Sequence, residues 1–117
     1  MLSPSCATRV WLACGVTDMR KSFNSLYALV NDKLGEDPSS GHVFVFCNRR
    51  RDRIKTLHWD GSGLWICAKR LEGGTFRWPC ADAQLDRIEL DWTQLQALLG
   101  GLDTSVLKSR NWIRGKK

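Results

Sequence analysis

The sequence predicts an α+β fold: an antiparallel sheet of about five strands, with one long helix packed on a face and a short C-terminal helix. Short apolar runs separated by Asp-Gly and Gly-Gly turns are typical of antiparallel hairpins. Residues 18–34 instead show the apolar spacing of a helix. The chain has 117 residues, of which 43% are hydrophobic and 26% charged, which is enough for one modest core.

The first expected elements are a strand and a helix. The apolar run "RVWLACGV" at residues 9–16 predicts a strand. Thr17 or Asp18 can cap the helix that follows, and Gly35 is placed to end it. We expect this helix over residues 18–34. Its apolar stripe consists of Met19, Phe23, Leu26, Tyr27, Val30 and Leu34.

The centre of the chain has the pattern of a sheet. The run "HVFVFCN" at residues 42–48 is apolar on both faces, as in a central strand. Three further runs, at residues 53–59, 64–71 and 75–79, are separated by turns. We expect these three to form an antiparallel meander.

The C-terminal part predicts a short strand, a helix and a tail. Residues 87–90, "RIEL", are a candidate strand. Asp91 and Gln94 have the spacing of a capping box at the start of a Leu-rich helix that stops near Gly100. We expect residues 1–102 to form a single domain and residues 103–117 a basic, mobile tail.

Several classes of protein are disfavoured by composition. No apolar run is long enough to span a membrane, and the N-terminus lacks the features of a signal peptide. The five cysteines contain no CxxC pair, so we expect reduced thiols and a cytoplasmic location. The two histidines do not supply zinc-ligand spacing, and we expect no cofactor and no metal.

Positive charge is concentrated in two places. Residues 48–70 contain seven basic and two acidic side chains, and the tail is also basic. These two excesses together exceed the net charge of +6, so the remainder of the chain is net acidic. Lys and Arg beside indole rings neutralise phosphates while the rings stack on bases. We therefore predict nucleic-acid binding through Arg49, Arg50, Arg51, Arg53, Lys55, Lys69 and Arg70.

The residues leave alternatives open. The arginine run is also compatible with a solvated hairpin tip, and Arg53 and Lys55 could pair with Asp60 or Glu72 across the strands. A weaker hypothesis is a metal-dependent nuclease built from Asp60, Glu72 and Lys69. The residue two positions before Lys69 is a cysteine and not an acid, which breaks a frequent nuclease pattern.

The runs "RVWLACGVTDMRKSFNSLYALV", "SGHVFVF", "NRRRDRIK" and "KRLE" carry a more specific signal. Over about residues 9–80 the chain resembles the TnpB-type accessory protein, the second open reading frame product, of the insertion sequence 66 family of bacterial transposable elements. The resemblance implies a protein that assists transposition beside a DDE-type transposase, with no catalytic residues of its own.

Two functions follow from the resemblance. The first is a non-catalytic accessory factor that binds DNA, at the element ends, through the basic hairpin. The second is an adaptor that contacts the transposase and touches DNA little. The sequence does not determine the oligomeric state or any sequence specificity.

Overall fold

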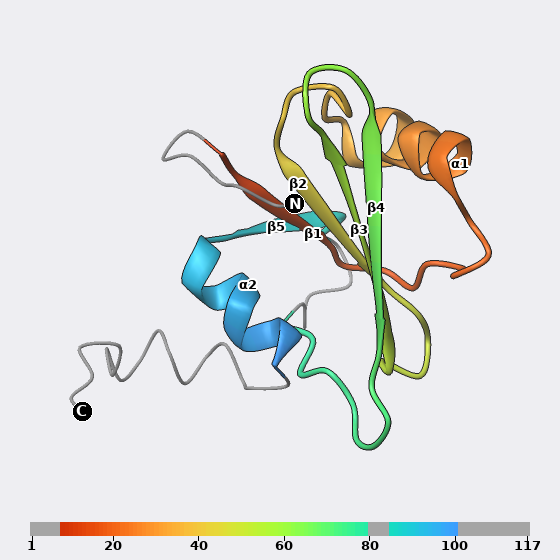
Figure 1. Ribbon diagram of the computed structural model, residues 1–117. Coiled ribbons are helices and arrows are strands. Elements are labelled where there is room, and N and C mark those ends of the chain that lie inside the picture. Colours follow the sequence, from red (N-terminus) through yellow and green to blue (C-terminus); the bar gives the residue numbers. More distant parts are fainter. Residues whose placement is uncertain (1–7, 80–84, 101–117) are drawn as a thin grey trace.

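A computed structural model describes residues 8–79 and 85–100, which form a five-stranded sheet in the order β4-β3-β2-β1-β5 (Figure 1). The predicted tail lies outside the described residues. The strands are β1 Val10–Ala13, β2 Val43–Cys47, β3 Arg53–Trp59, β4 Leu64–Arg70 and β5 Arg87–Leu90.

The sheet is mixed, so the prediction of an antiparallel sheet is wrong at one pairing. β1 and β2 are parallel, with Val10 opposite Val43, whereas the other three pairings are antiparallel. The segment between them explains the difference, because a helical crossover returns the chain to the start of the sheet and β2 then runs in the same direction as β1. The predicted number of strands is confirmed.

The antiparallel meander consists of β2, β3 and β4, and the strand predicted at 75–79 is absent. That segment is irregular and turns toward the core. The Phe76 N–H donates to the Arg51 carbonyl at 2.6 Å, and the Phe76 ring is buried. The segment therefore packs under the hairpin loop and does not extend the sheet.

The first helix begins later than predicted. It consists of α1, Phe23–Ala28, which continues as the π-helix η1, Leu29–Leu34. The N-cap is Ser22, and Gly35 ends the helix in the left-handed conformation, with φ 68°. Asp18 does not cap the helix, because its carboxylate accepts bonds from the backbone N–H and guanidinium of Arg20.

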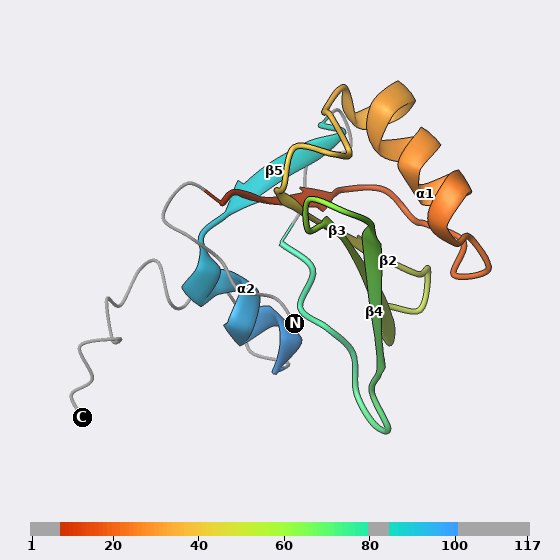
Figure 2. The ribbon, with the colours of Figure 1, turned by 45° about the horizontal axis from the view of Figure 1, so that its top comes forward.

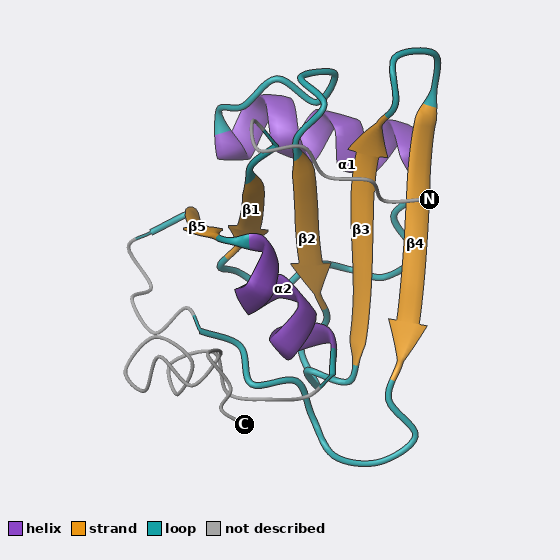
Figure 3. Ribbon diagram, turned by 60° about the vertical axis from the view of Figure 1, so that its left-hand side comes forward, coloured by secondary structure: helices purple, strands orange, loops and turns teal. Residues whose placement is uncertain are grey.

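The two helices cover opposite faces of the sheet (Figures 2 and 3). On one face, Leu26, Val30 and Leu34 pack against Phe44 and Phe46. On the other, α2 (Trp92–Leu99) packs Leu95 and Leu98 against the opposite side of β1 and β2. The alternating apolar side chains of β2 therefore fill two cores, as expected for a central strand.

The capping box predicted for α2 is confirmed. The Gln94 N–H donates to Asp91 Oδ1 at 2.7 Å, and the Asp91 N–H donates to Gln94 Oε1 at 3.0 Å. The apolar stripe predicted for the first helix is only partly buried, since Phe23 and Tyr27 lie at the surface. The side of the helix that faces the sheet is narrower than the predicted stripe, because its buried positions are Leu26, Val30 and Leu34.

Two further expectations are tested by the structure. Cys47 is a buried free thiol whose pKa is raised by burial, whereas Cys14 is disulfide-bonded, so the expectation that all cysteines are reduced is wrong there. Within residues 8–79 and 85–100, no helix has the length and apolar character needed to cross a lipid bilayer.

Candidate nucleic-acid interface

The loop that joins β2 to β3 carries the arginine run, and its shape is set by Asn48 and Asp52. The Asn48 side-chain oxygen accepts from the backbone N–H groups of Asp52 and Arg53, both at 3.1 Å. The Asn48 amide donates to Asp52 Oδ1 at 2.7 Å. Asp52, the acid within the arginine run, is therefore committed to the loop and does not neutralise the neighbouring arginines.

Arg51 is separated from Arg49 and Arg50 by the backbone of this loop. It adopts φ 62°, the left-handed region that few non-glycine residues enter. Its guanidinium lies over the Trp78 ring, 5.5 Å from the centroid. Arg51 is consequently half-buried on the side of the loop where the 75–79 segment packs, while Arg49 and Arg50 remain exposed.

Arg49 and Arg50 line an open groove of about 410 Å³ between this loop and the segment that precedes α1. The other charged residues in its lining are Arg53, Asp18 and Arg20. Arg20 is neutralised, because its Nη2 lies 2.6 Å from Asp18 Oδ2. The same contact holds the pKa of the Asp18 carboxyl well below its usual range.

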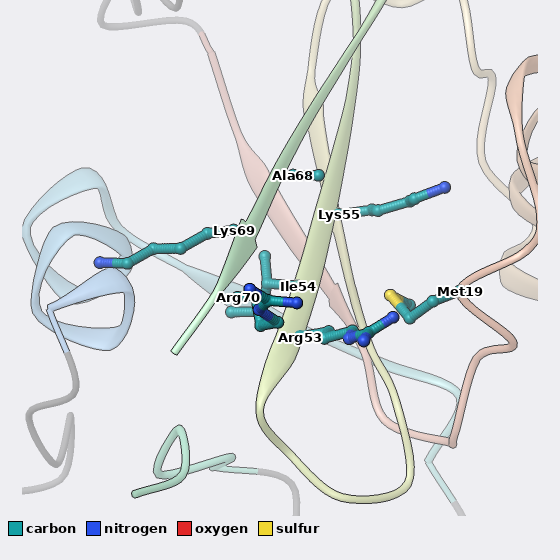
Figure 4. Close-up of a pocket in the computed structure, with 7 residues that line it drawn as sticks. All are labelled: Met19, Arg53, Ile54, Lys55, Ala68, Lys69 and Arg70. Carbon is teal, nitrogen blue, oxygen red and sulfur yellow. The ribbon is translucent and has the colours of Figure 1, made fainter. Parts of the chain in front are cut away.

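A second groove, of about 310 Å³, adjoins the first through Met19 and Arg53, which line both (Figure 4). Arg53 at the start of β3 stands directly opposite Arg70 at the end of β4. Like charges in this cross-strand position destabilise a sheet. We use the name arginine groove for the surface formed by Arg49, Arg50, Arg53 and Arg70.

Among the described residues, Arg49, Arg50 and Arg53 have no carboxylate within ion-pair distance. Arg70 lies 3.4 Å from Glu72, but both side chains are largely exposed, and such a pair stabilises a fold very little. The alternative in which Arg53 pairs with Asp60 or Glu72 across the strands is therefore not what the structure shows.

The two predicted lysines point away from each other, as Figure 4 shows. Lys55 lies on the same face as the arginine groove and donates to the Lys21 carbonyl at 2.8 Å. Lys69 lies on the opposite face and donates to the Leu99 carbonyl at the end of α2, at 2.7 Å. The structure thus brings five of the seven predicted side chains together on one face. Arg51 lies on the other side of the loop, and Lys69 lines the second groove but extends its ammonium to the opposite face.

The described tryptophans do not accompany the arginines of the groove. Among residues 8–79 and 85–100, no aromatic side chain lines either groove. Trp65, which is 45% exposed, lies on the face of β4 that carries Lys69. The groove therefore offers contacts to phosphates and no platform on which a base could stack.

The carboxylates of the nuclease hypothesis do not converge. Asp60 precedes β4 and Glu72 follows it, so the length of the strand separates them. Asp60 is occupied within its turn: it accepts from the Ser62 and Gly63 N–H groups and from Trp65 Nε1, and these bonds lower its pKa. Within the described part of the chain, no group of acidic, His and Cys side chains could hold a metal ion.

Sequence reasoning missed the clamp formed by Asn48 and Asp52 and the part that Met19 plays in joining the two grooves. The clamp had a local signal, because an Asn or Asp at a turn often bonds to the backbone a few residues away. Met19 had no such signal, because its place depends on how the pre-helix segment packs against β3.

Comparison with known proteins adds the family. The family model described as "IS66 Orf2 like protein" matches residues 8–109 of the chain. The chain belongs to the IS66 Orf2-like family. Membership implies involvement in the transposition of an insertion sequence, and the resemblance inferred from the sequence is confirmed.

Two relatives of this IS66 Orf2-like protein come from Sinorhizobium fredii. Uncharacterized protein y4jC is 34% identical over 110 residues, which cover 94% of this chain and 92% of the relative. Uncharacterized protein y4hO is 40% identical over 103 residues, which cover 88% of each. No solved structure matches the chain.

Proposed function

We propose that this IS66 Orf2-like protein is a cytoplasmic, non-catalytic accessory factor that binds duplex DNA during transposition, through the arginine groove. The opposition of Arg53 and Arg70 carries the proposal. Two arginines in directly opposite cross-strand positions cost stability unless an anion lies close to them, and a phosphate supplies that anion with bidentate geometry.

The contents of the grooves favour phosphate contacts on a duplex. Arg49 and Arg50 extend the positive surface along the loop, and Lys55 lies at its inner margin. Contacts of this kind position a protein on DNA. The described lining of both grooves holds no aromatic side chain, which disfavours binding to splayed single strands. We place Arg51 and Lys69 outside the primary contact, as supports of the loop and of α2.

The test is a fluorescence titration of labelled duplexes, one with an element-end sequence and one random, at two salt concentrations. If four arginines neutralise four phosphates, affinity falls about a hundredfold between about 50 and 200 mM salt. Replacing Arg49, Arg50 and Arg53 with Ala is expected to remove most of this salt dependence.

A matched control removes the same charge elsewhere. Arg9, Lys33 and Arg77 are exposed and lie outside both grooves. Their combined replacement by Ala is expected to leave DNA affinity nearly unchanged. Equal losses in the two triple variants would show that only net charge matters and would refute the groove as the binding site.

An adaptor function has its own supporting observation. Phe23 and Tyr27, both on α1, are 46% and 39% exposed. Exposed apolar side chains gathered on one helix are typical of a protein contact. We propose the element-encoded DDE-type transposase as that second partner. Co-purification with the transposase that survives nuclease digestion and is lost in a Phe23→Ser, Tyr27→Ser variant would support it; a complex lost on digestion alone would not.

A further inference from the structure

The strand β4 forms one edge of the sheet, and no described segment pairs with its outer side (Figure 3). It is seven residues long, whereas the opposite edge strand, β5, has four. An exposed edge presents a row of unpaired backbone donors and acceptors to other chains. Its first five residues, "LWICA", include no charge and no proline.

The hydrogen-bonding phase of β4 follows from the two ends of the β3–β4 ladder. The Asp60 N–H donates to the Gly63 carbonyl at 3.0 Å, and the Leu71 N–H donates to the Asp52 carbonyl at 2.9 Å. In an antiparallel ladder hydrogen-bonded and non-bonded pairs alternate. Both ends show that the odd-numbered residues of β4 direct their backbone groups toward β3. The backbone groups that face outward are those of Leu64, Ile66, Ala68 and Arg70.

We propose that two copies of this chain pair through β4, antiparallel, about a two-fold axis at Cys67. In this register Ile66 faces Ala68 of the second copy and Leu64 faces Arg70, so all four outward-facing residues find backbone partners. The five-stranded sheets of the two copies then form one continuous sheet.

Charge disfavours a neighbouring register. The axis at Cys67 sets Lys69 opposite Trp65 of the second copy, whose indole is bonded to Asp60 at 2.7 Å. The Lys69 ammonium already donates to the Leu99 carbonyl of its own chain, so the aliphatic part of its side chain lies against that ring. Moving the axis to residue 69 would instead oppose Lys69 to itself, and like charges directly opposite destabilise a sheet.

The dimer has a consequence for DNA, and this consequence alone rests on the proposed function. A two-fold axis perpendicular to the sheet keeps both arginine grooves on one side of the dimer. Arg70 and its symmetry mate lie six residues apart along the paired strands, or about 20 Å. Two grooves related in this way would contact an inverted repeat.

The test is sedimentation equilibrium of the full chain without DNA, so its failure is separate from failure of DNA binding. We expect twice the mass of one chain at micromolar concentration. Ala68→Pro removes an outward N–H without removing a bond to β3, and each dimer loses two hydrogen bonds. The dissociation constant is expected to rise about tenfold or more.

Ala68→Val is the matched control, because it retains the N–H in a residue that favours strands, and it is expected to remain dimeric. A monomeric parent chain, or a dimer unaffected by Ala68→Pro, would overturn the proposal. A parent chain that is monomeric by itself and associates only with the transposase would also overturn the proposal.

Cross-linking tests the register without depending on the fold of the proline variant. The axis brings Cys67 of the two copies together as a non-hydrogen-bonded pair, where the side chains approach most closely. An added oxidant is expected to yield a covalent dimer of the parent chain that is absent in Cys67→Ser. Cross-linking that persists in Cys67→Ser, or fails in the parent, argues against the register.

Discussion

Arg87 and the arginine groove lie on the same face of the sheet, at its two opposite edges, and treat positive charge in opposite ways. Arg87 donates to Glu36 and to the Leu34 carbonyl, both at 2.8 Å, and its guanidinium lies 4.7 Å from the centroid of the Trp11 ring. Arg53 stands opposite Arg70 in the sheet and, among the described residues, has no carboxylate within ion-pair distance. The chain therefore neutralises a structural arginine, Arg87, with its own groups. It does not do so for the arginines of the groove, and the groove stays positive.

The sharpest way to test this contrast is Arg87→Ala. We expect a loss of about 2 kcal/mol in the free energy of unfolding, because the variant removes an ion pair, a carbonyl contact and a stacked ring. DNA affinity is expected to stay within about twofold of the parent value. A change of that size is smaller than the loss of one phosphate contact would cause. Urea unfolding measures the first and duplex titration the second. A stable variant with weakened DNA binding would reverse the assigned roles.

Asn48→Ala tests whether the loop holds the groove in shape. Three side-chain hydrogen bonds are lost, and we expect unfolding to become easier by about 1–2 kcal/mol. The variant keeps every arginine, so weaker DNA binding with an unchanged salt slope is expected. Asn48→Asp retains the two bonds accepted by the side-chain oxygen but sets a carboxylate against Asp52, so it is expected to destabilise the loop as well. No change in stability would mean that the loop does not need the clamp.

Arg50 and Arg51 are neighbours in sequence and differ in surroundings, which allows a comparison at equal charge. Arg51→Ala is expected to destabilise the fold by about 1 kcal/mol through loss of the contact with Trp78. Arg50→Ala is expected to leave stability within about 0.5 kcal/mol and to reduce the salt slope of DNA binding by about one. Identical behaviour of the two variants would show that the loop does not separate their roles.

The smallest expected effect concerns the like-charge pair itself. Arg53→Gln removes the repulsion with Arg70 and is expected to stabilise the protein by about 0.3 kcal/mol. It is also expected to weaken DNA binding several-fold. A thermal scan at low salt detects the gain, which fades as salt screens the pair. Destabilisation would indicate that Arg53 has a structural partner after all.

Much of the fold was predictable because the relevant signals are local. Alternation along residues 53–59 is enough to place Arg53, Lys55 and Leu57 on one face, since side chains of a strand point to opposite faces in turn. The capping box at Asp91 and the helix end at Gly35 were predicted from spacing alone. The start of the first helix was missed because Asp18 bonds to Arg20 and leaves capping to Ser22.

The candidate site was predicted less completely, because a run of like residues does not show where each side chain goes. Arg49 and Arg51 are two positions apart, yet a left-handed residue and a clamped loop direct them to different sides. Lys55 and Lys69 both counted as free charge in the sequence, while each donates to a distant carbonyl in the fold.

By itself the sequence determined the segregated charge, the hairpin turns, the face that each strand residue occupies and the family. Only the tertiary structure decided that β1 runs parallel to β2, that Arg53 stands opposite Arg70, and that β4 is left as an edge. The physical reason is the separation in sequence between the residues that interact. Turns, caps and alternation depend on residues within a few positions, whereas strand order and register depend on which distant segments bury their apolar faces together.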